Sequence, residues 1–238
     1  MDSSFLNMEF LIDTFFVALS GVPVALLVTV VAMAIALPVG FFLALTRINE
    51  IPVLNWFTKI YVSFVRGTPI IIQIFVLYSV IPLILSGIFE KYHIDYPVYD
   101  INPLWYAFII FSFNTAAILV EVFRSALKTV SQGQLEAAYS VGLTSSQAYR
   151  RIIIPQMLVT ALPNLCTATI NLIKATSLGY AISLQEITLK AKVAANVGYN
   201  YLEAYIDIFI VYMILCMTVE YLFKLFEKRL SRYKYTTA

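Results

Sequence analysis

Five long apolar runs most constrain what this chain can fold into. A helix needs about 20 predominantly apolar residues to cross a bilayer core roughly 30 Å thick. Hydrophobic residues make up 61% of the 238-residue sequence and charged residues 13%. Since the runs lack the alternation of barrel strands, the sequence predicts an all-helical integral membrane protein. Its spans are expected at residues 22–45, 70–85, 104–127, 157–173 and 204–225.

Three other segments carry mixed signals. Residues 1–18 place Phe5 and later apolar residues at roughly helical spacing but are too interrupted to span, so we expect an amphipathic interfacial helix. Pro69 pushes Thr68 towards an extended conformation, which predicts a helix break before the second span. Residues 174–203 are too polar to span and too apolar for a loop, and we expect short helices packed at the membrane face.

The distribution of Lys and Arg predicts the orientation. These residues gather in the turn after the first span, at the exit of the third span with its loop, and in the C-terminal tail. Because cytoplasmic loops carry the excess of basic residues, the N-terminus is expected outside and the C-terminus inside. The whole chain, 1–238, is then one transmembrane domain with a five-helix core at 22–228 and a cytoplasmic loop at 129–155.

This cytoplasmic loop combines helix-forming and helix-ending signals. Residues 134–141 favour a short helix, and Gly142 stands where a left-handed C-terminal cap is needed. Thr144 to Gln147 matches the Thr-x-x-Gln capping box, so a second helix is expected there, and Pro155 bends or restarts it at the membrane. The first helix, with small alanines for close approach, either docks into a partner's groove or is a structural turn.

The loop resembles the EAA motif of permease subunits of ATP-binding-cassette importers. The residues at the motif positions are Glu136-Ala137-Ala138, Gly142 and Ile154-Pro155. The polar amino-acid branch of this family is similar at further places: VRGTPIIIQIF at 65–75, Glu121-x-x-Arg124, Gly133-Gln134 and IKATSL at 173–178. Ala175 departs from the pattern, because that branch commonly has Asp there, so no role is carried over for that carboxylate.

The resemblance implies a type I importer permease with five spans, in a bacterial cytoplasmic membrane, paired with a second permease subunit, identical or related. The pair would sit on two cytoplasmic ATPase subunits and receive substrate from an extracytoplasmic solute-binding protein. The chain has no GxxxxGK[ST] motif, so it is expected to be no enzyme and to bind no cofactor, with ATP and Mg²⁺ held by the ATPase subunits. The expected coupling residues are Gln134, Glu136, Ala137, Ala138, Gly142, Leu143, Arg150 and Pro155.

Polar residues inside the spans are candidates for a substrate path, since they are costly in a bilayer. Glu121 is the strongest candidate: it either holds the ammonium group of a solute in a cavity or pairs with Arg124 at i+3. Asn114, Thr115 and Gln73 either contact the same solute or form hydrogen bonds between helices.

A helix interruption completes the predicted path. Lys174, Thr176 and Ser177 mark it, and polar backbone at membrane depth is tolerated where it lines a cavity, so a gate or cavity role is expected there. The expected function is translocation of an amino acid, cystine or another polar one. A stand-alone channel or an ion-driven carrier is the alternative, and neither needs a coupling helix. A membrane enzyme is disfavoured because the sequence has no HExxH, GxSxG or clustered His/Asp constellation, and a metal site is not expected.

Overall fold

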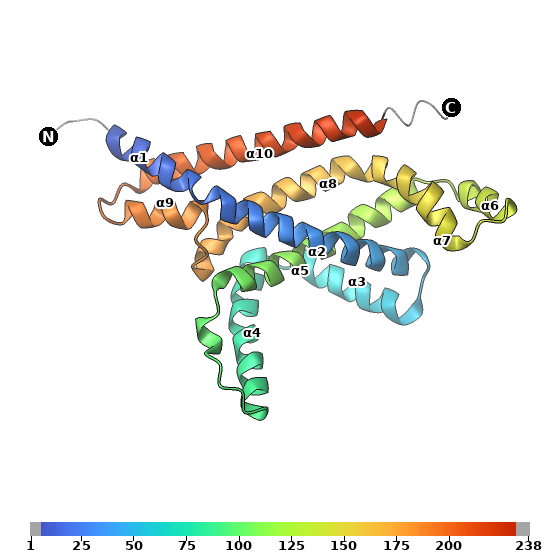
Figure 1. Cartoon of the computed structure of the whole chain (residues 1–238), viewed down its shortest axis with the longest axis horizontal. Helices are drawn as coiled ribbons and strands as arrows, with labels where there is room; N and C mark the ends of the chain where they lie inside the picture. The colour runs from blue at the N-terminus through green and yellow to red at the C-terminus, as the bar shows by residue number, and fades with distance from the viewer. Residues whose placement is uncertain (1–5, 232–238) are drawn as a thin grey trace.

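The computed structural model describes residues 6–231, and every regular element in this range is helical. Five helical runs are long and apolar enough to cross a membrane, which confirms the five expected spans. The fourth helix is longer than expected and continues to Lys91, because no helix breaker follows Gly87. The helices in Figure 1 are α1 Met8–Leu19, α2 Val22–Ile48, α3 Pro52–Gly67, α4 Ile70–Lys91, α5 Pro103–Lys128, α6 Gln132–Ser140, α7 Ser145–Ala148, α8 Ile154–Thr176, α9 Ile187–Ala195 and α10 Tyr201–Ser231.

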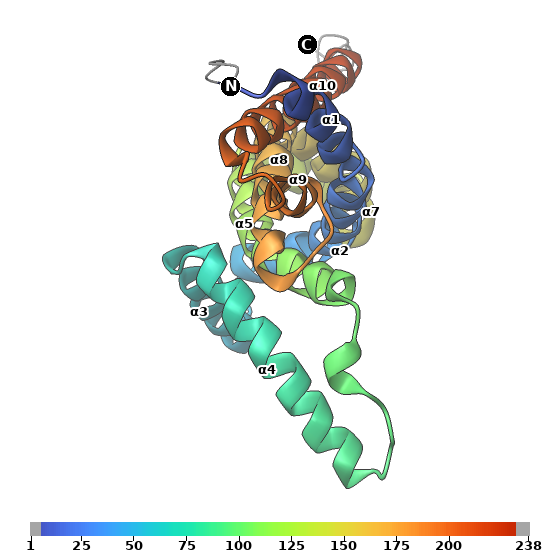
Figure 2. The same cartoon turned by 90° about the vertical axis from the view of Figure 1, so that its left-hand side faces the viewer.

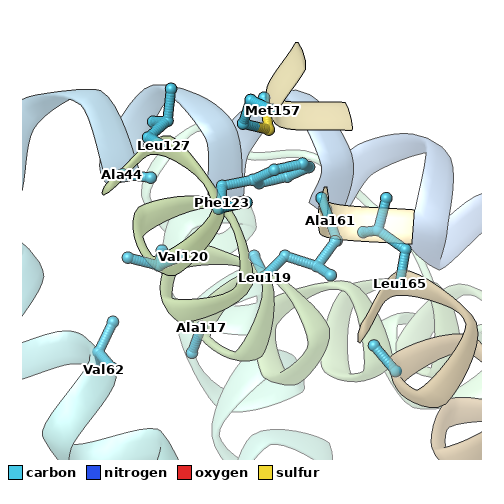
Figure 3. Packing of buried hydrophobic residues seen from close by; sticks show 14 of the residues in the cluster. Ala44, Val62, Ala117, Leu119, Val120, Phe123, Leu127, Met157, Ala161 and Leu165 are labelled. Atoms are coloured by element: carbon cyan, nitrogen blue, oxygen red, sulfur yellow. The ribbon is translucent and has the colours of Figure 1, made fainter. Parts of the chain in front are cut away.

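Helix α5 lies at the centre and packs mainly against α2 and α8. Ala36, Gly40 and Ala44 form a stripe of small residues along α2, and such stripes let spanning helices approach closely. A Cβ on Gly40 would lie 2.8 Å from the Cβ of Leu119, so the two backbones are in near contact. Figure 3 shows Leu119 and Phe123 of α5 packed within this cluster of buried side chains.

The expected interfacial helix is α1, and it packs against α9 and α10. Thr14 and Ala18 are buried, whereas Met8 and Phe16 are 59% and 64% exposed. α1 is held close to the bundle because only a short turn separates it from α2, and the two helices form one apolar run, Met8–Ile48. A location at the membrane interface stays a prediction, and Phe5 lies outside the described residues.

The turn between α1 and α2 depends on Gly21. A Cβ at this position would lie 2.4 Å from the Ile187 backbone nitrogen and 2.6 Å from the Glu186 carbonyl carbon. Since those atoms belong to the backbone that begins α9, they have little freedom to move.

Gly21→Val is therefore expected to destabilise the folded protein by about 1–3 kcal/mol through overpacking. The measurement is thermal unfolding of detergent-purified protein. Gly87→Val is the matched control, because nothing lies within 4 Å of a Cβ there. Equal melting temperatures for the two variants would contradict the close approach at Gly21.

Two helix interruptions were expected, and the first is confirmed. Thr68 between α3 and α4 is extended, with φ −121° and ψ 143°. The second falls at Ser177, one of the residues expected to mark it: α8 runs through Lys174 to Thr176, and the chain then tightens into the 3₁₀ segment η3, Ser177–Ile182. No proline or glycine follows Lys174 until Gly179, and this explains why the α-helix continues.

The segment after the second interruption contains short helices, as expected. Ser183 ends η3 in the left-handed region with φ 60°, and α9 follows. Ile187, Ala191 and Ala195 of α9 are fully buried. This segment is thus part of the packed interior, while its level in the membrane stays a prediction.

The ends of the helices are grouped in space. α6 and α7 lie at one end of the bundle, together with the C-terminal ends of α2 and α5, whereas α9 and the start of α10 lie at the opposite end (Figure 1). Helix α4 stands away from the bundle in both views (Figure 2). Many of its apolar side chains are consequently exposed, Leu83 by 66% and Ile84 by 55%.

Candidate functional site

The loop at residues 129–155 forms a compact helix–turn–helix. Ser131 accepts a hydrogen bond from the Gly133 N–H at 3.3 Å and caps α6. At the other end, Thr144 and Gln147 form the expected capping box, with hydrogen bonds of 3.0 and 3.4 Å, and begin α7. Each helix therefore has a defined start, although α7 spans only four residues.

Gly142 forms the left-handed cap between the two helices, as predicted, with φ +80°. Its N–H donates to the Tyr139 carbonyl at 2.9 Å, and the Leu143 N–H donates to the Ala138 carbonyl at 3.1 Å. This pair of bonds is the Schellman motif, which satisfies the last carbonyls of a helix. The Tyr139 hydroxyl and Ser145 Oγ, 2.9 Å apart, hold the turn closed.

The two faces of α6 differ in exposure. Leu135 packs inward, and Ala138 is only 1% exposed, so of the two alanines expected on the surface only Ala137 is presented. Leu135 and Ala138 are three residues apart and therefore lie on one face of α6, and α6 packs against the turn at Tyr149–Ile153. Among the predicted coupling residues Leu143 is half-buried, and the exposed ones are Gln134, Glu136, Ala137, Gly142, Arg150 and Pro155.

A π-helical turn, η2 at Tyr149–Ile153, carries this loop into α8. Pro155 lacks a backbone N–H, and the Ile154 N–H bonds to the Tyr149 carbonyl five residues earlier. A wider turn removes the clash that Pro155 would cause in a regular α-helix. The second half of the loop therefore continues without a break into the span as one helical run, Ser145–Ile182, and α6 packs against its π-helical turn.

Glu121 is held by two arginines. Arg124 reaches Glu121 Oε2 with two nitrogens at 2.7 and 2.9 Å, which confirms the i+3 pairing. The other oxygen accepts from Arg47, at the end of α2, a partner that sequence reasoning missed because it lies 74 residues away. The three side chains are only 19–28% exposed. With both oxygens engaged, the structure favours a structural role, and solute binding by Glu121 stays a prediction.

Gln73 and Asn114 meet, as the interhelical interpretation predicted. The Asn114 amide donates to Gln73 Oε1 at 2.9 Å, joining α5 to α4. The Gln73 amide donates to the Val65 carbonyl at 2.8 Å and to Thr68 Oγ1 at 2.8 Å, which closes the break before α4. Thr115 is 2% exposed and also faces the protein interior.

A further cluster of hydrogen-bonded polar side chains lies where α8 ends. Thr176 Oγ1 is 3.3 Å from the Tyr212 hydroxyl, and that hydroxyl donates to Glu186 Oε2 at 2.8 Å. Glu186 is fully buried and also accepts the N–H groups of Thr188 and Leu189 at the start of α9. Burial raises the pKa of the Glu186 carboxyl to about 6, although these hydrogen bonds oppose the shift. The predicted path residues therefore fall in separate places and do not line one cavity.

One face of α8 is polar and exposed, and of its residues only Lys174 was predicted as a path residue. Thr160, Asn164, Thr167, Asn171 and Lys174 recur at helical spacing, and all five are exposed. The last three line a groove of about 420 Å³ between α8 and α10. The helical period of these polar residues was the signal that could have revealed the face.

A second groove is larger, about 630 Å³, and lies between α2, α3 and α5. Its lining includes Ile35, Phe57 and Trp105, and Tyr61 and Ser112 are the polar side chains among its lining residues. An apolar groove gives a polar solute few hydrogen bonds, so the α8–α10 groove is the better candidate path.

Comparison with known proteins gives the family. Residues 36–232 match the model of the family described as "Binding-protein-dependent transport system inner membrane component". This chain belongs to that family. A probable amino-acid permease protein of Bacillus subtilis, YxeN, is 37% identical over 227 residues, covering 95% of this chain and 97% of that protein. The L-cystine transport system permease protein TcyL of the same organism is 36% identical over 210 residues, covering 88% and 85%.

Solved structures agree on the fold of the permease. An amino acid ABC transporter crystallised with histidines matches with a TM-score of 0.76 at 27% identity, covering 94% of this chain and 99% of that chain. The MetNI methionine ABC transporter matches with a TM-score of 0.69 at 19% identity, covering 94% and 97%. The permease therefore has the type I ABC importer fold that the resemblance predicted.

Proposed function

We propose that this permease forms the translocation path of an ATP-driven importer for an amino acid, cystine or another polar one. Family membership and the Schellman-capped α6 helix carry the proposal together. Two of the most similar relatives are an L-cystine permease and a probable amino-acid permease, which supports an amino acid as the solute. The polar face of α8 supports a path for a solute that needs hydrogen bonds.

The coupling surface is α6 with its outward side chains. Glu136 and Ala137 are exposed on it, and Gly142 leaves open space beside the cap. A short rigid helix with small and polar side chains suits a groove on a partner. The continuous path from α6 through η2 into α8 supports transmission of ATPase movement to the groove.

The proposed assembly contains two permease subunits, identical or related, two cytoplasmic ATPase subunits and an extracytoplasmic solute-binding protein. The exposed apolar side of α4 is available to the second permease subunit and to lipid. ATP and Mg²⁺ are bound by the ATPase subunits and not by this chain. The orientation is N-terminus outside and C-terminus inside, which the position of Arg47 and Arg124 at the loop end of the bundle supports.

The test is copurification followed by transport. The tagged permease is purified from its native membrane, its partners are identified by mass spectrometry, and the complex is reconstituted in vesicles. Uptake of a radiolabelled panel, the twenty protein amino acids and cystine, is measured with and without ATP. ATP-dependent uptake of a panel member is expected.

The alternative function gives a different result. A channel or an ion-driven carrier would move solute in vesicles without an ATPase subunit, or in response to an ion gradient alone. Either outcome, or the absence of uptake of all panel members, would overturn the proposal.

A further inference from the structure

The groove between α8 and α10 is lined by two lysines, Lys174 and Lys224, and by two glutamates, Glu220 and Glu227. Lys174 takes part in none of the salt bridges among the described residues. Glu220, which also lines the groove, is engaged by Lys224 at 2.7 Å. An ammonium group in a spanning helix is costly unless an anion or water accompanies it.

Lys174 lies in the last turn of α8. The helical run Ser145–Ile182, which is apolar enough to span a membrane, includes this turn. The groove that Lys174 lines follows both α8 and α10.

Its neighbours on the same face offer further donors. Among the described residues, the side chains of Asn164 and Asn171 form no hydrogen bond, whereas the Thr167 hydroxyl donates to the Pro163 carbonyl of its own helix at 3.1 Å. Unsatisfied carboxamides on a lipid-facing surface would be unfavourable. The face therefore requires water, a polar solute or a polar partner surface.

Contact with an identical permease through this face is disfavoured. A two-fold axis brings the same patch of each subunit together, so two Lys174 ammonium groups would approach each other. Like charges at close range repel, and an anion between them relieves the repulsion. The chemistry of the face points to a carboxylate.

We propose that Lys174 binds the carboxylate of the transported amino acid in the α8–α10 groove, with the Asn171 amide as a second donor. This inference rests on the proposed function. The groove volume of about 420 Å³ lies within the usual range of small-molecule pockets, about 300–1,000 Å³. An ammonium–carboxylate contact with a supporting amide is a charge-assisted arrangement, stronger than neutral hydrogen bonds.

The experiment uses the reconstituted permease–ATPase complex without the solute-binding protein, so that only the membrane site selects. The radiolabelled ligand is the panel member that the wild-type complex transports. Its binding to the complex is measured in competition with its carboxamide derivative. The wild-type complex is expected to prefer the free amino acid. Lys174→Met is expected to lose about tenfold or more of this preference, the effect of one charge-assisted hydrogen bond.

Three variants make the result specific. Lys174→Arg keeps the positive charge and is expected to retain most of the preference, and Asn171→Leu is expected to lose part of it. Lys91→Met removes an exposed lysine from the far end of α4 and is expected to change nothing. Co-elution of the subunits on a sizing column verifies assembly, which the exposed position of Lys174 should preserve.

The outcomes separate the two proposals. If the complete wild-type complex, with its solute-binding protein, transports no panel member, the proposed function is overturned, and this inference with it. If uptake occurs but the Lys174→Met complex prefers the free amino acid over its carboxamide as strongly as the wild type does, the carboxylate site is overturned. The proposed function then stands. Uptake by the wild type without measurable binding to the complex also overturns the site.

Discussion

Gly142→Val is expected to reduce ATP-driven uptake about tenfold or more while the complex continues to hydrolyse ATP. Gly142 has φ +80°, a conformation that a β-branched residue adopts only under strain. That strain is on the order of 1–3 kcal/mol, and it is relieved when the cap opens and the two Schellman hydrogen bonds are lost. Helix α6 would then lose its fixed orientation on α8, and ATPase movement would no longer reach the groove.

Three further variants define the cause of the effect. Gly142→Asn is expected to retain most uptake, because asparagine tolerates the left-handed conformation. Glu136→Lys keeps the fold but reverses an exposed charge on α6, and it is expected to uncouple hydrolysis from uptake as well. Glu90→Lys, on the exposed end of α4, is the matched charge reversal and should transport normally.

The measurements are ATP hydrolysis and solute uptake by the same vesicle preparation. A normal ratio of uptake to hydrolysis in both Gly142→Val and Glu136→Lys would remove the coupling role from α6. The loop would then be only a structural turn, which was the second interpretation of its sequence.

Glu121→Leu is expected to cause the second large effect, a loss of stability of about 2–4 kcal/mol. The substitution leaves Arg47 and Arg124 without their carboxylate at 19% and 28% exposure. Removing one member of a buried ion pair is strongly destabilising, because the remaining charge is uncompensated. Thermal unfolding in detergent measures the effect.

The exposed pair on α10 provides the control. Glu220→Leu removes the partner of Lys224, but these side chains are 46% and 64% exposed, so little change in melting temperature is expected. Similar melting temperatures for the two leucine variants would contradict the structural role of Glu121.

Uptake by Glu121→Gln distinguishes the two interpretations of Glu121. The structural role predicts less folded transporter and weaker uptake, with an unchanged KM for the solute. Solute binding predicts a raised KM at normal stability. Because both carboxylate oxygens are occupied by arginines, we expect the first result.

Much of the fold was predictable because its signals are local. The five spans follow from runs of apolar residues that must be helical in lipid. The cap at Gly142 and the box at Thr144 follow from residues three to five positions apart. The break at Thr68 follows from the proline beside it.

The sequence did not show where long-range packing buries small residues. Thr14 and Ala18 of the predicted interfacial helix pack against the bundle. Ala138 of α6 is buried, while Ala137 beside it is exposed. Neither position can be decided without knowing which helix lies opposite.

The number of spans, the caps of the loop helices and the family motif could be read from the chain alone, because each depends on residues close together in it. Which polar groups meet depends on how the helices pack. The tertiary structure joined Glu121 to Arg47 across 74 residues and Gln73 to Asn114 across 41. It also left Asn171 and Lys174 open beside α10. A polar residue in a span is either paired inside the protein or available to a solute, and only the neighbouring helix determines which.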